Sequence, residues 1–223
     1  RKAVNPPGEA WEDTKIIAEL SNRLGYQMNY SGPEEIFEEM GKLWPAVAGI
    51  TYGRIREHGI QWPCPTKDHP GTEYLYKTGF PRGNVPFTIV EYIPSAEITD
   101  IEYPFTLTTG RNLFQYHSGS MTRRVKPIEA HAGKPYMEIC PSDAIREGIA
   151  EGQEVEVISR RGNISISVRI SDRVSEGVVF IPMHYREAAV NMLTNDALDP
   201  YAKTPELKVC AVKIKNKMSR RHT

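Results

Sequence analysis

The residue types with the most chemical potential gather in one polar segment, residues 108–124, with the sequence TTGRNLFQYHSGSMTRR. Glycine allows a backbone to turn its N–H groups toward an anion, and Arg111 offers a planar guanidinium that pairs with phosphate. Together with the hydroxyl groups, this composition favours a cradle for a phosphate or another polar ligand. The open alternative is a loop whose polar groups bond to one another, with Arg123 and Arg124 in water.

A second polar cluster follows a short apolar stretch, in the sequence PMHYREAAVN at residues 182–191. His184 would stand at the end of a buried strand, and a helical turn would bring Asn191 to the same side. The pattern alone favours a structural histidine and a surface asparagine. Further along, Lys208 could bind an anion, although an ordinary lysine at a strand edge is the commoner case.

The known catalytic motifs do not occur in this sequence. The six histidines lack the spacing of metal ligands, and Ser118 has Tyr116 where a nucleophile elbow needs glycine. No phosphate-binding or dinucleotide-binding glycine pattern is present either. Cys64 lies in a Trp-Pro-Cys-Pro stretch with no base at a fixed spacing, which favours a packed corner over a reactive thiol. The sequence therefore does not predict a self-contained enzyme.

The composition of the 223 residues is that of a globular protein, with 39% hydrophobic and 25% charged residues. The formal net charge is zero, so a general basic surface for nucleic acid is not expected. No apolar run is long enough to span a membrane, and no signal peptide is visible. Three separate cysteines without CxxC spacing suggest neither a disulfide framework nor a zinc site, and we expect a cytoplasmic location.

The first part of the chain is predicted to be rich in α-helix. Residues 11–24 place four apolar side chains on one helical face, and Gly25 follows as a stop. A second helix is predicted to begin after Ser31 as its cap, with Pro33 in the first turn. Residues 52–59 are a third, shorter helical stretch. Residues 60–95 are rich in proline, glycine and aromatic residues, which predicts an irregular connector with room for one hairpin.

The second part is predicted to be β-structure. Six short strands are expected near residues 103–107, 136–140, 153–159, 164–170, 177–182 and 206–214, with a turn at 160–162 and a helical turn from Pro141 capped by Ser142 or Asp143. Six closely spaced strands predict a small closed barrel. The boundary is expected between residues 94 and 99, which gives two regions, 1–97 and 98–223.

Several long stretches of the chain resemble the dimethyl sulfoxide reductase family of molybdenum or tungsten oxidoreductases, and formate dehydrogenase alpha subunits in particular. The resemblance is carried by KAVNPPGEAWEDTKIIAELSNRLG, GPEEIFEEM, AGITYGRIREHGIQWPCPTKDHPGTEYLY, YPFTLTTGRNLFQYHSGSMTRR, ISRRGNISISVRISDRVSEGVVFIPMHY and AAVNMLTNDALDPYAKTPELKVCAVKI. It implies a mixed α and β fold, with a C-terminal double-psi β-barrel at 98–223. Residues 1–97 would then be the tail of the preceding α/β domain and its connector.

The resemblance also implies a cofactor and the residues that hold it. The cofactor is molybdopterin guanine dinucleotide, with molybdenum or tungsten held by the full enzyme. The implied cofactor-binding residues are Thr108, Thr109, Gly110, Arg111, Asn112, Gln115, His117, Ser118, Met183, His184, Asn191, Leu207 and Lys208, some of them through the backbone. Gln115 departs from the residue that relatives often carry at its position. No catalytic residue and no metal ligand is expected in this stretch.

The iron–sulfur cysteines and the metal-binding cysteine or selenocysteine of the family do not occur here, so the sequence is expected to be a fragment or a split subunit that is inactive alone. Formate oxidation to carbon dioxide is the implied activity of the full enzyme. A nitrate reductase, or a non-catalytic barrel used for assembly, are the alternatives. The implied partners are the rest of the catalytic subunit and iron–sulfur or flavin electron-transfer subunits.

Overall fold

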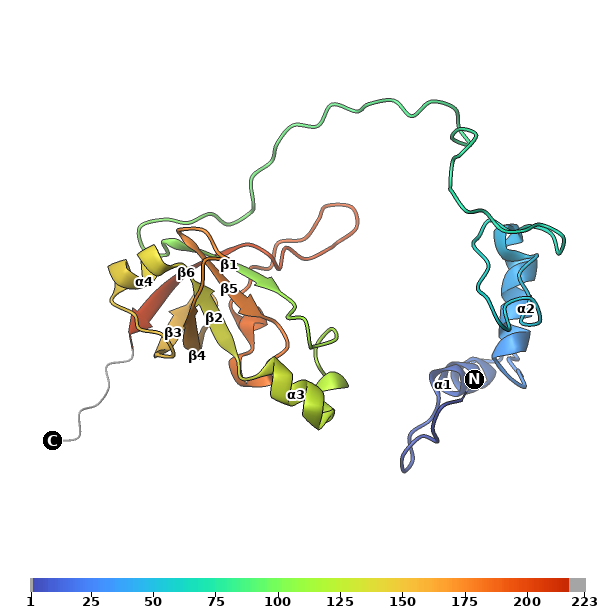
Figure 1. Cartoon of the computed structure of the whole chain (residues 1–223), viewed down its shortest axis with the longest axis horizontal. Helices are drawn as coiled ribbons and strands as arrows, with labels where there is room; N and C mark the ends of the chain where they lie inside the picture. The colour runs from blue at the N-terminus through green and yellow to red at the C-terminus, as the bar shows by residue number, and fades with distance from the viewer. Residues whose placement is uncertain (1, 217–223) are drawn as a thin grey trace. The chain divides into compact units, whose positions relative to one another are not determined.

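The computed structural model of the chain describes residues 2–216 and divides into two compact units, with the division between Ile89 and Val90 (Figure 1). The first unit contains the helices α1 (Asp13–Arg23) and α2 (Pro33–Leu43) and a short 3-10 helix at Pro45–Val47. Gly25 takes the left-handed conformation that stops α1, as predicted. Neither α1 nor α2 buries a residue, and Ile17 on α1 is 60% exposed.

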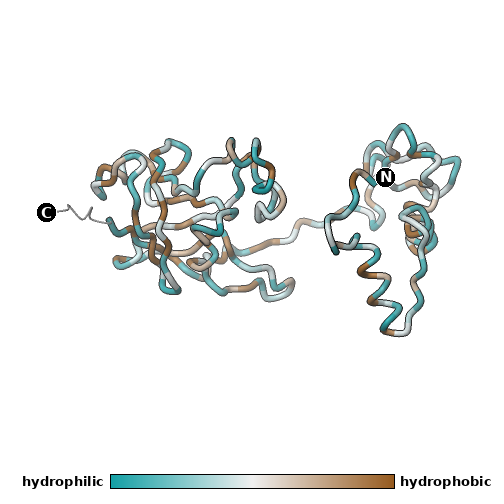
Figure 2. The backbone as a smooth tube through the Cα atoms, turned by 90° about the horizontal axis from the view of Figure 1, so that it is seen from below, coloured by the Kyte–Doolittle hydropathy of each residue, from teal (hydrophilic) through white to brown (hydrophobic). Residues whose placement is uncertain are grey.

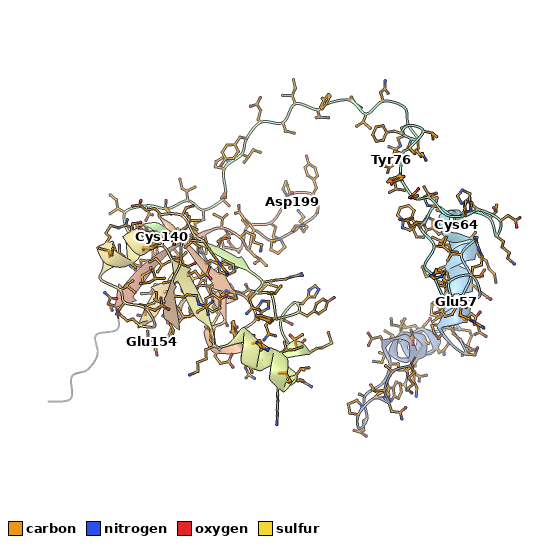
Figure 3. All side chains as sticks on the ribbon, in the orientation of Figure 1. Glu57, Cys64, Tyr76, Cys140, Glu154 and Asp199 are labelled. Atoms are coloured by element: carbon orange, nitrogen blue, oxygen red, sulfur yellow. The ribbon has the colours of Figure 1, made fainter. Side chains whose placement is uncertain are left out.

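The first unit has a small core around Cys64. Val47, Ile50 and Cys64 are buried there. The guanidinium of Arg54 donates to the carbonyl oxygens of Gly49 at 2.6 Å and of His69 at 2.7 Å, and one of its nitrogens lies 3.3 Å from the Cys64 sulfur. The stretch around Cys64 is therefore a packed corner, as the sequence predicted (Figure 3).

Two local predictions in the first unit are wrong. Residues 52–59 form turns instead of a helix, because glycines stand at both ends and the side chain of Arg54 ties the segment to the corner. Ser31 does not cap α2, since the N-cap residue is Gly32. The hydroxyl and the backbone N–H of Ser31 instead both donate to the Glu35 carboxylate. The bond from the hydroxyl is the main cause that lowers the pKa of Glu35, and the bond from the N–H, at 2.7 Å, lowers it further. Residues 60–95 contain no strand.

The second unit is a closed barrel of six strands, as predicted from their spacing. The strands are β1 (Phe105–Gly110), β2 (Tyr136–Ile139), β3 (Glu154–Ile158), β4 (Asn163–Ile170), β5 (Val178–Pro182) and β6 (Cys210–Asn216). They close in the order β1-β5-β2-β4-β3-β6. The pairs β1–β5 and β2–β4 are parallel and the other pairs are antiparallel.

This strand order has an internal symmetry. Exchanging β1, β2 and β3 with β4, β5 and β6 maps the order and the strand directions onto themselves. Two interlocked three-strand halves, joined by the parallel pairs β1–β5 and β2–β4, make a double-psi β-barrel, so the predicted fold class is confirmed. Alternating apolar residues line the barrel core, among them Leu107, Val157 and Ile181, and apolar stretches run along the strands (Figure 2).

Two helices complete the barrel unit, α3 (Lys126–Ala132) and α4 (Pro141–Glu147). The helix α3 is too short for its periodicity to have predicted it. The predicted cap of α4 is wrong: Cys140 is the N-cap residue, without a capping side chain. Asp143 is instead fully buried, because its carboxylate accepts the backbone N–H of Gly177 at 2.7 Å and pairs with Arg146. In this way α4 is tied to the start of β5.

The strand pairing decides which loops share one end of the barrel. Gly110 and Pro182 are paired at the carboxyl ends of the parallel strands β1 and β5, so the chain leaves both strands side by side. The strand β6 runs antiparallel to β1, with Cys210 opposite Leu107, and so it begins at this same end. A loop closed by a bridge between Leu198 and Pro205 leads into it, with Asp199 marked in Figure 3.

Candidate functional site

Three segments meet at this end of the barrel, and hydrogen bonds hold them together. The backbone N–H of Met183 donates to the Gly110 carbonyl at 2.9 Å. The Thr109 hydroxyl donates to the Leu207 carbonyl at 2.8 Å, and the Lys208 ammonium donates to the Thr109 carbonyl at 2.7 Å. Five of the residues implied by the resemblance are therefore brought together, although they lie in three separate parts of the sequence.

His184 connects the end of β5 to the loop after β1, residues 111–124, which we name the cofactor loop. Its side chain is buried, with 3% of the residue exposed. The backbone N–H of Asn112 donates to Nε2 at 2.9 Å, and Nδ1 lies in hydrogen-bonding contact with the His117 carbonyl oxygen. The carbonyl can only accept, so Nδ1 carries a proton. Nε2 accepts the Asn112 N–H and therefore carries none, which makes the ring neutral.

Burial is the main cause that lowers the pKa of His184 below its usual value. The hydrogen bond to His117 acts in the opposite direction, while the positive charges of Arg111 and Arg123 lower the pKa further. The neutral ring is therefore the form that this surrounding favours.

Asn112 shapes the beginning of the cofactor loop. Its side-chain oxygen accepts the backbone N–H groups of Phe114 at 3.1 Å and Gln115 at 3.0 Å. Its side-chain nitrogen donates to the Tyr185 hydroxyl at 3.0 Å, and that hydroxyl donates to the Ala132 carbonyl at 3.0 Å. Asn112 thus forms an Asx turn and also attaches the loop to α3.

Gln115 points into the protein and is 4% exposed. Its amide nitrogen donates to the Glu129 carboxylate at 2.7 Å, and its oxygen accepts the Thr122 hydroxyl. Arg123 lies beside it and pairs with Glu129 at 3.1 Å and with Glu187 at 2.8 Å, and the bond to Glu187 is the main cause that raises the arginine pKa. Both ends of the Gln115 side chain are therefore bonded within the protein, one to Glu129 of α3 and the other to Thr122 of the loop.

Other implied residues present their side chains to solvent. Arg111, His117 and Ser118 are exposed, with a guanidinium nitrogen of Arg111 3.4 Å from Nδ1 of His117. Asn191 is also exposed and accepts the Thr194 hydroxyl at its backbone carbonyl. Within residues 2–216, the structure gives the Asn191 side chain no hydrogen bond to another implied site residue. Its place in the site therefore stays a prediction.

A groove of about 710 Å³ runs beside the cofactor loop, and Thr108, Arg111 and Asn112 line one part of it. Its floor is a row across four strands, in which Thr108 pairs with Phe180, Phe180 with Glu138, and Glu138 with Arg169. The guanidinium of Arg169 stacks over the Tyr136 ring at 3.5 Å.

The sequence reasoning missed Glu138 and Arg169 as neighbours of the loop. The strict alternation of residues 164–170 does place Arg169 on the face away from the core. That β4 lies next to β2 could not be seen in the sequence.

The donor set of this end of the barrel fits an anionic ligand. It offers exposed cations, hydroxyl groups and backbone N–H groups, as a pyrophosphate requires. The described residues contain no group of three or more histidine, cysteine or acidic side chains that could hold a metal ion. They also contain no helix that is long and apolar enough to cross a membrane.

Comparisons with known proteins agree with this donor set. Residues 105–211 match the family described as molydopterin dinucleotide binding domain. F420-dependent formate dehydrogenase subunit alpha of Methanocaldococcus jannaschii is 51% identical over 96% of this chain and 32% of its own length. Formate dehydrogenase H of Escherichia coli is 39% identical over 96% and 31%, and the assimilatory nitrate reductase catalytic subunit of Bacillus subtilis is 37% identical over 96% and 32%.

A solved structure extends the likeness of fold to almost the whole chain. Acetylene hydratase from Pelobacter acetylenicus superposes with a TM-score of 0.60 at 20% identity, over 97% of this chain and 34% of that protein. The chain spans about a third of the length of the curated relatives it matches. The matched model shows that residues 105–211 are a molydopterin dinucleotide binding domain, and the chain as a whole is similar to a part of the formate dehydrogenase alpha subunits.

Proposed function

We propose that the barrel holds the guanine dinucleotide arm of a molybdopterin cofactor in a formate dehydrogenase, which oxidises formate to carbon dioxide. The observation that carries this proposal is the meeting of the cofactor loop, the end of β5 and the Leu207–Lys208 segment at one end of the barrel. The curated formate dehydrogenases that match the chain support the choice of substrate.

The residues at this end divide into those that reach the cofactor and those that shape the surface. Arg111, Ser118 and Lys208 offer a guanidinium, a hydroxyl and an ammonium group to the pyrophosphate. The remaining proposed cofactor-binding residues contribute through backbone groups or neighbouring side chains: Thr108, Thr109, Gly110, Asn112, Gln115, His117, Met183, His184, Asn191 and Leu207. When bound, the cofactor supplies a molybdenum or tungsten centre that accepts two electrons from the substrate.

Other parts of the enzyme are proposed to supply the rest of the chemistry. The metal ligand and an iron–sulfur cluster would belong to the remaining two thirds of the catalytic subunit, and electrons would leave through iron–sulfur or flavin subunits. A nitrate reductase is the second candidate, because the Bacillus subtilis enzyme is 37% identical over 96% of this chain. The residues described here would hold the dinucleotide in the same way in either enzyme.

The test uses the whole catalytic subunit that contains this sequence, purified anaerobically from its native host. Acid release of GMP and the fluorescence of the oxidised pterin measure cofactor content, and reduction of a dye with formate or oxidation of a reduced dye with nitrate measures the reaction. We expect bound guanine dinucleotide and formate-dependent dye reduction. Nitrate-dependent activity alone would favour the second candidate, and a protein free of pterin when active would overturn the proposal.

A further inference from the structure

We propose that His184 is a positioning residue, which holds the cofactor loop in its binding shape as a neutral imidazole and releases it when protonated. An effect of His184 protonation on cofactor binding rests on the function proposed above. An effect of His184 protonation on the loop conformation does not rest on that function, because it concerns contacts within the chain. Acidification would then loosen the loop before it unfolds the barrel.

One ring bonds two points of the loop that are five residues apart. The backbone N–H of Asn112 donates a hydrogen bond to Nε2, and Nδ1 donates one to the carbonyl oxygen of His117. His117 has a φ of 50°, in the left-handed region that residues other than glycine rarely adopt. The bond from His184 therefore stabilises a backbone conformation that the loop alone would not favour.

The groups around the ring give little support to a positive charge on it. Arg111 at the start of the loop and Arg123 near its end are cations that act on the ring. The neighbouring Tyr185 is neutral at physiological pH, and burial raises its pKa further. The acidic side chains of Glu129 in α3 and Glu187 after β5 are paired with Arg123. Among the described residues, no carboxylate is hydrogen-bonded to the His184 ring.

Protonation would also turn the acceptor of the Asn112 N–H group into a donor. Nε2 cannot carry a proton and still accept that hydrogen bond, so the two N–H groups would face each other. The closed loop therefore binds the proton less tightly than the open loop does. Its stability is complete above about pH 6.5, the ordinary histidine pKa, and decreases as the pH falls through the lowered pKa of the closed form.

The two loop positions that bond to His184 lie beside the proposed ligand-contacting residues. Arg111 lies next to Asn112, and Ser118 lies next to His117, so both proposed ligand-contacting side chains flank the two bonded positions. If the two hydrogen bonds to the His184 ring break, the guanidinium of Arg111 and the hydroxyl of Ser118 are no longer held on one surface. A ligand then has to order the loop while it binds, which weakens its apparent affinity.

Hydrogen exchange on the chain 1–223 without cofactor tests this inference. The protection of the Asn112 amide, corrected for the intrinsic exchange rate, is measured between pH 8 and pH 5. We expect it to fall by up to about tenfold per pH unit below about pH 6.5, since one proton is linked to loop opening. The Met183 amide, which bonds to the Gly110 carbonyl, is the internal control and keeps its protection. Equal protection of the Asn112 amide at all pH values would overturn the inference.

Two variants separate His184 from other histidines. His184→Gln is expected to remove the pH dependence, because its amide does not titrate. His131→Gln is the matched control, since His131 is exposed and stacks on Phe114 of the same loop at 5.6 Å. It should keep the full dependence. If His184→Gln retains the dependence, or His131→Gln abolishes it, His184 is not the group that titrates.

A measurement on the unaltered chain covers the case in which His184→Gln does not fold. Nitrogen-15 chemical shifts of the imidazole at pH 7.5 report which ring nitrogen carries the proton, and we expect it on Nδ1. A proton on Nε2 would contradict the hydrogen bond from Asn112. If the loop behaves as expected but the whole enzyme retains its pterin unchanged at pH 5.5, the inference stands and the proposed role of the loop in binding fails.

Discussion

The ammonium group of Lys208 donates to the carbonyl oxygen of Thr109 at 2.7 Å, although 99 residues separate them in the chain. The Thr109 hydroxyl returns a hydrogen bond to the Leu207 carbonyl at 2.8 Å. The last turn before β6 is thereby fastened to the end of β1. This pair of bonds sets the position of a cation that the sequence alone left as an ordinary strand-edge lysine.

Thr109→Val should loosen this attachment with little change in volume. The hydroxyl is lost and the Leu207 carbonyl loses its donor in a buried place, which is expected to destabilise the chain by about 1–2 kcal/mol. Urea unfolding of the chain 1–223 measures the change, with Thr109→Ser as the control that keeps the hydroxyl. A valine variant as stable as the unaltered chain would show that the bond contributes nothing.

Gly110→Ala should be poorly tolerated because of the ring beside it. A Cβ atom at this position would lie 2.7 Å from a carbon of the Phe180 ring, closer than such contacts occur. We expect a loss of about 1–3 kcal/mol in the free energy of unfolding. Gly59→Ala is the control, since no atom lies within 4 Å of its Cβ position.

The cause of the Gly110 effect can be isolated with a second substitution. Phe180→Leu removes the ring edge, and the double variant Gly110→Ala, Phe180→Leu should be less destabilised than the sum of the two single variants. If the losses in the free energy of unfolding of the two single variants simply add up in the double variant, the destabilisation by Gly110→Ala does not come from contact with the Phe180 ring.

Arg111→Ala should reduce cofactor occupancy in the whole enzyme and not only its rate. Hydrogen bonds to charged groups contribute about 1.5–3 kcal/mol, so binding of the dinucleotide should weaken roughly 10- to 100-fold. GMP released per protein is the measurement. Arg124→Ala is the control, because Arg124 is an exposed arginine in the same loop. Full occupancy in Arg111→Ala would mean that its guanidinium is only solvated.

Cys210 should resist alkylation in the folded chain. Burial is the main cause that raises the pKa of its thiol to about 11, so almost no thiolate is present at pH 8. A thiol reagent should label Cys210 only after urea unfolding. Because the folded pKa is above the unfolded one, the stabilisation from this thiol is present below about pH 9 and is lost as the pH rises toward 11. Rapid labelling of folded chain at pH 8 would contradict the burial.

Gln115 shows what a sequence position cannot reveal. Its departure from the family pattern put its role in doubt, yet its amide is bonded to Glu129 of α3 at one end and to Thr122 of the loop at the other. His184 is similar, since the pattern after β5 favoured a structural histidine without indicating which groups it bonds. In both cases at least one partner comes from another segment, and only the packed structure brings the two within bonding distance.

The sequence by itself determined the local features whose causes are local. The alternation at residues 164–170 predicted β4, Gly25 marked the end of α1, and the glycine, hydroxyl and arginine content of the cofactor loop indicated a polar ligand. The tertiary structure decided the features that depend on strand order and register. The parallel pairing of β1 with β5 brings Gly110 beside Pro182, and so it joins Asn112, His184 and Lys208 at one end of the barrel. Hydrogen bonds between strands distant in the chain set this register, and a periodic pattern within one strand carries no record of its neighbour.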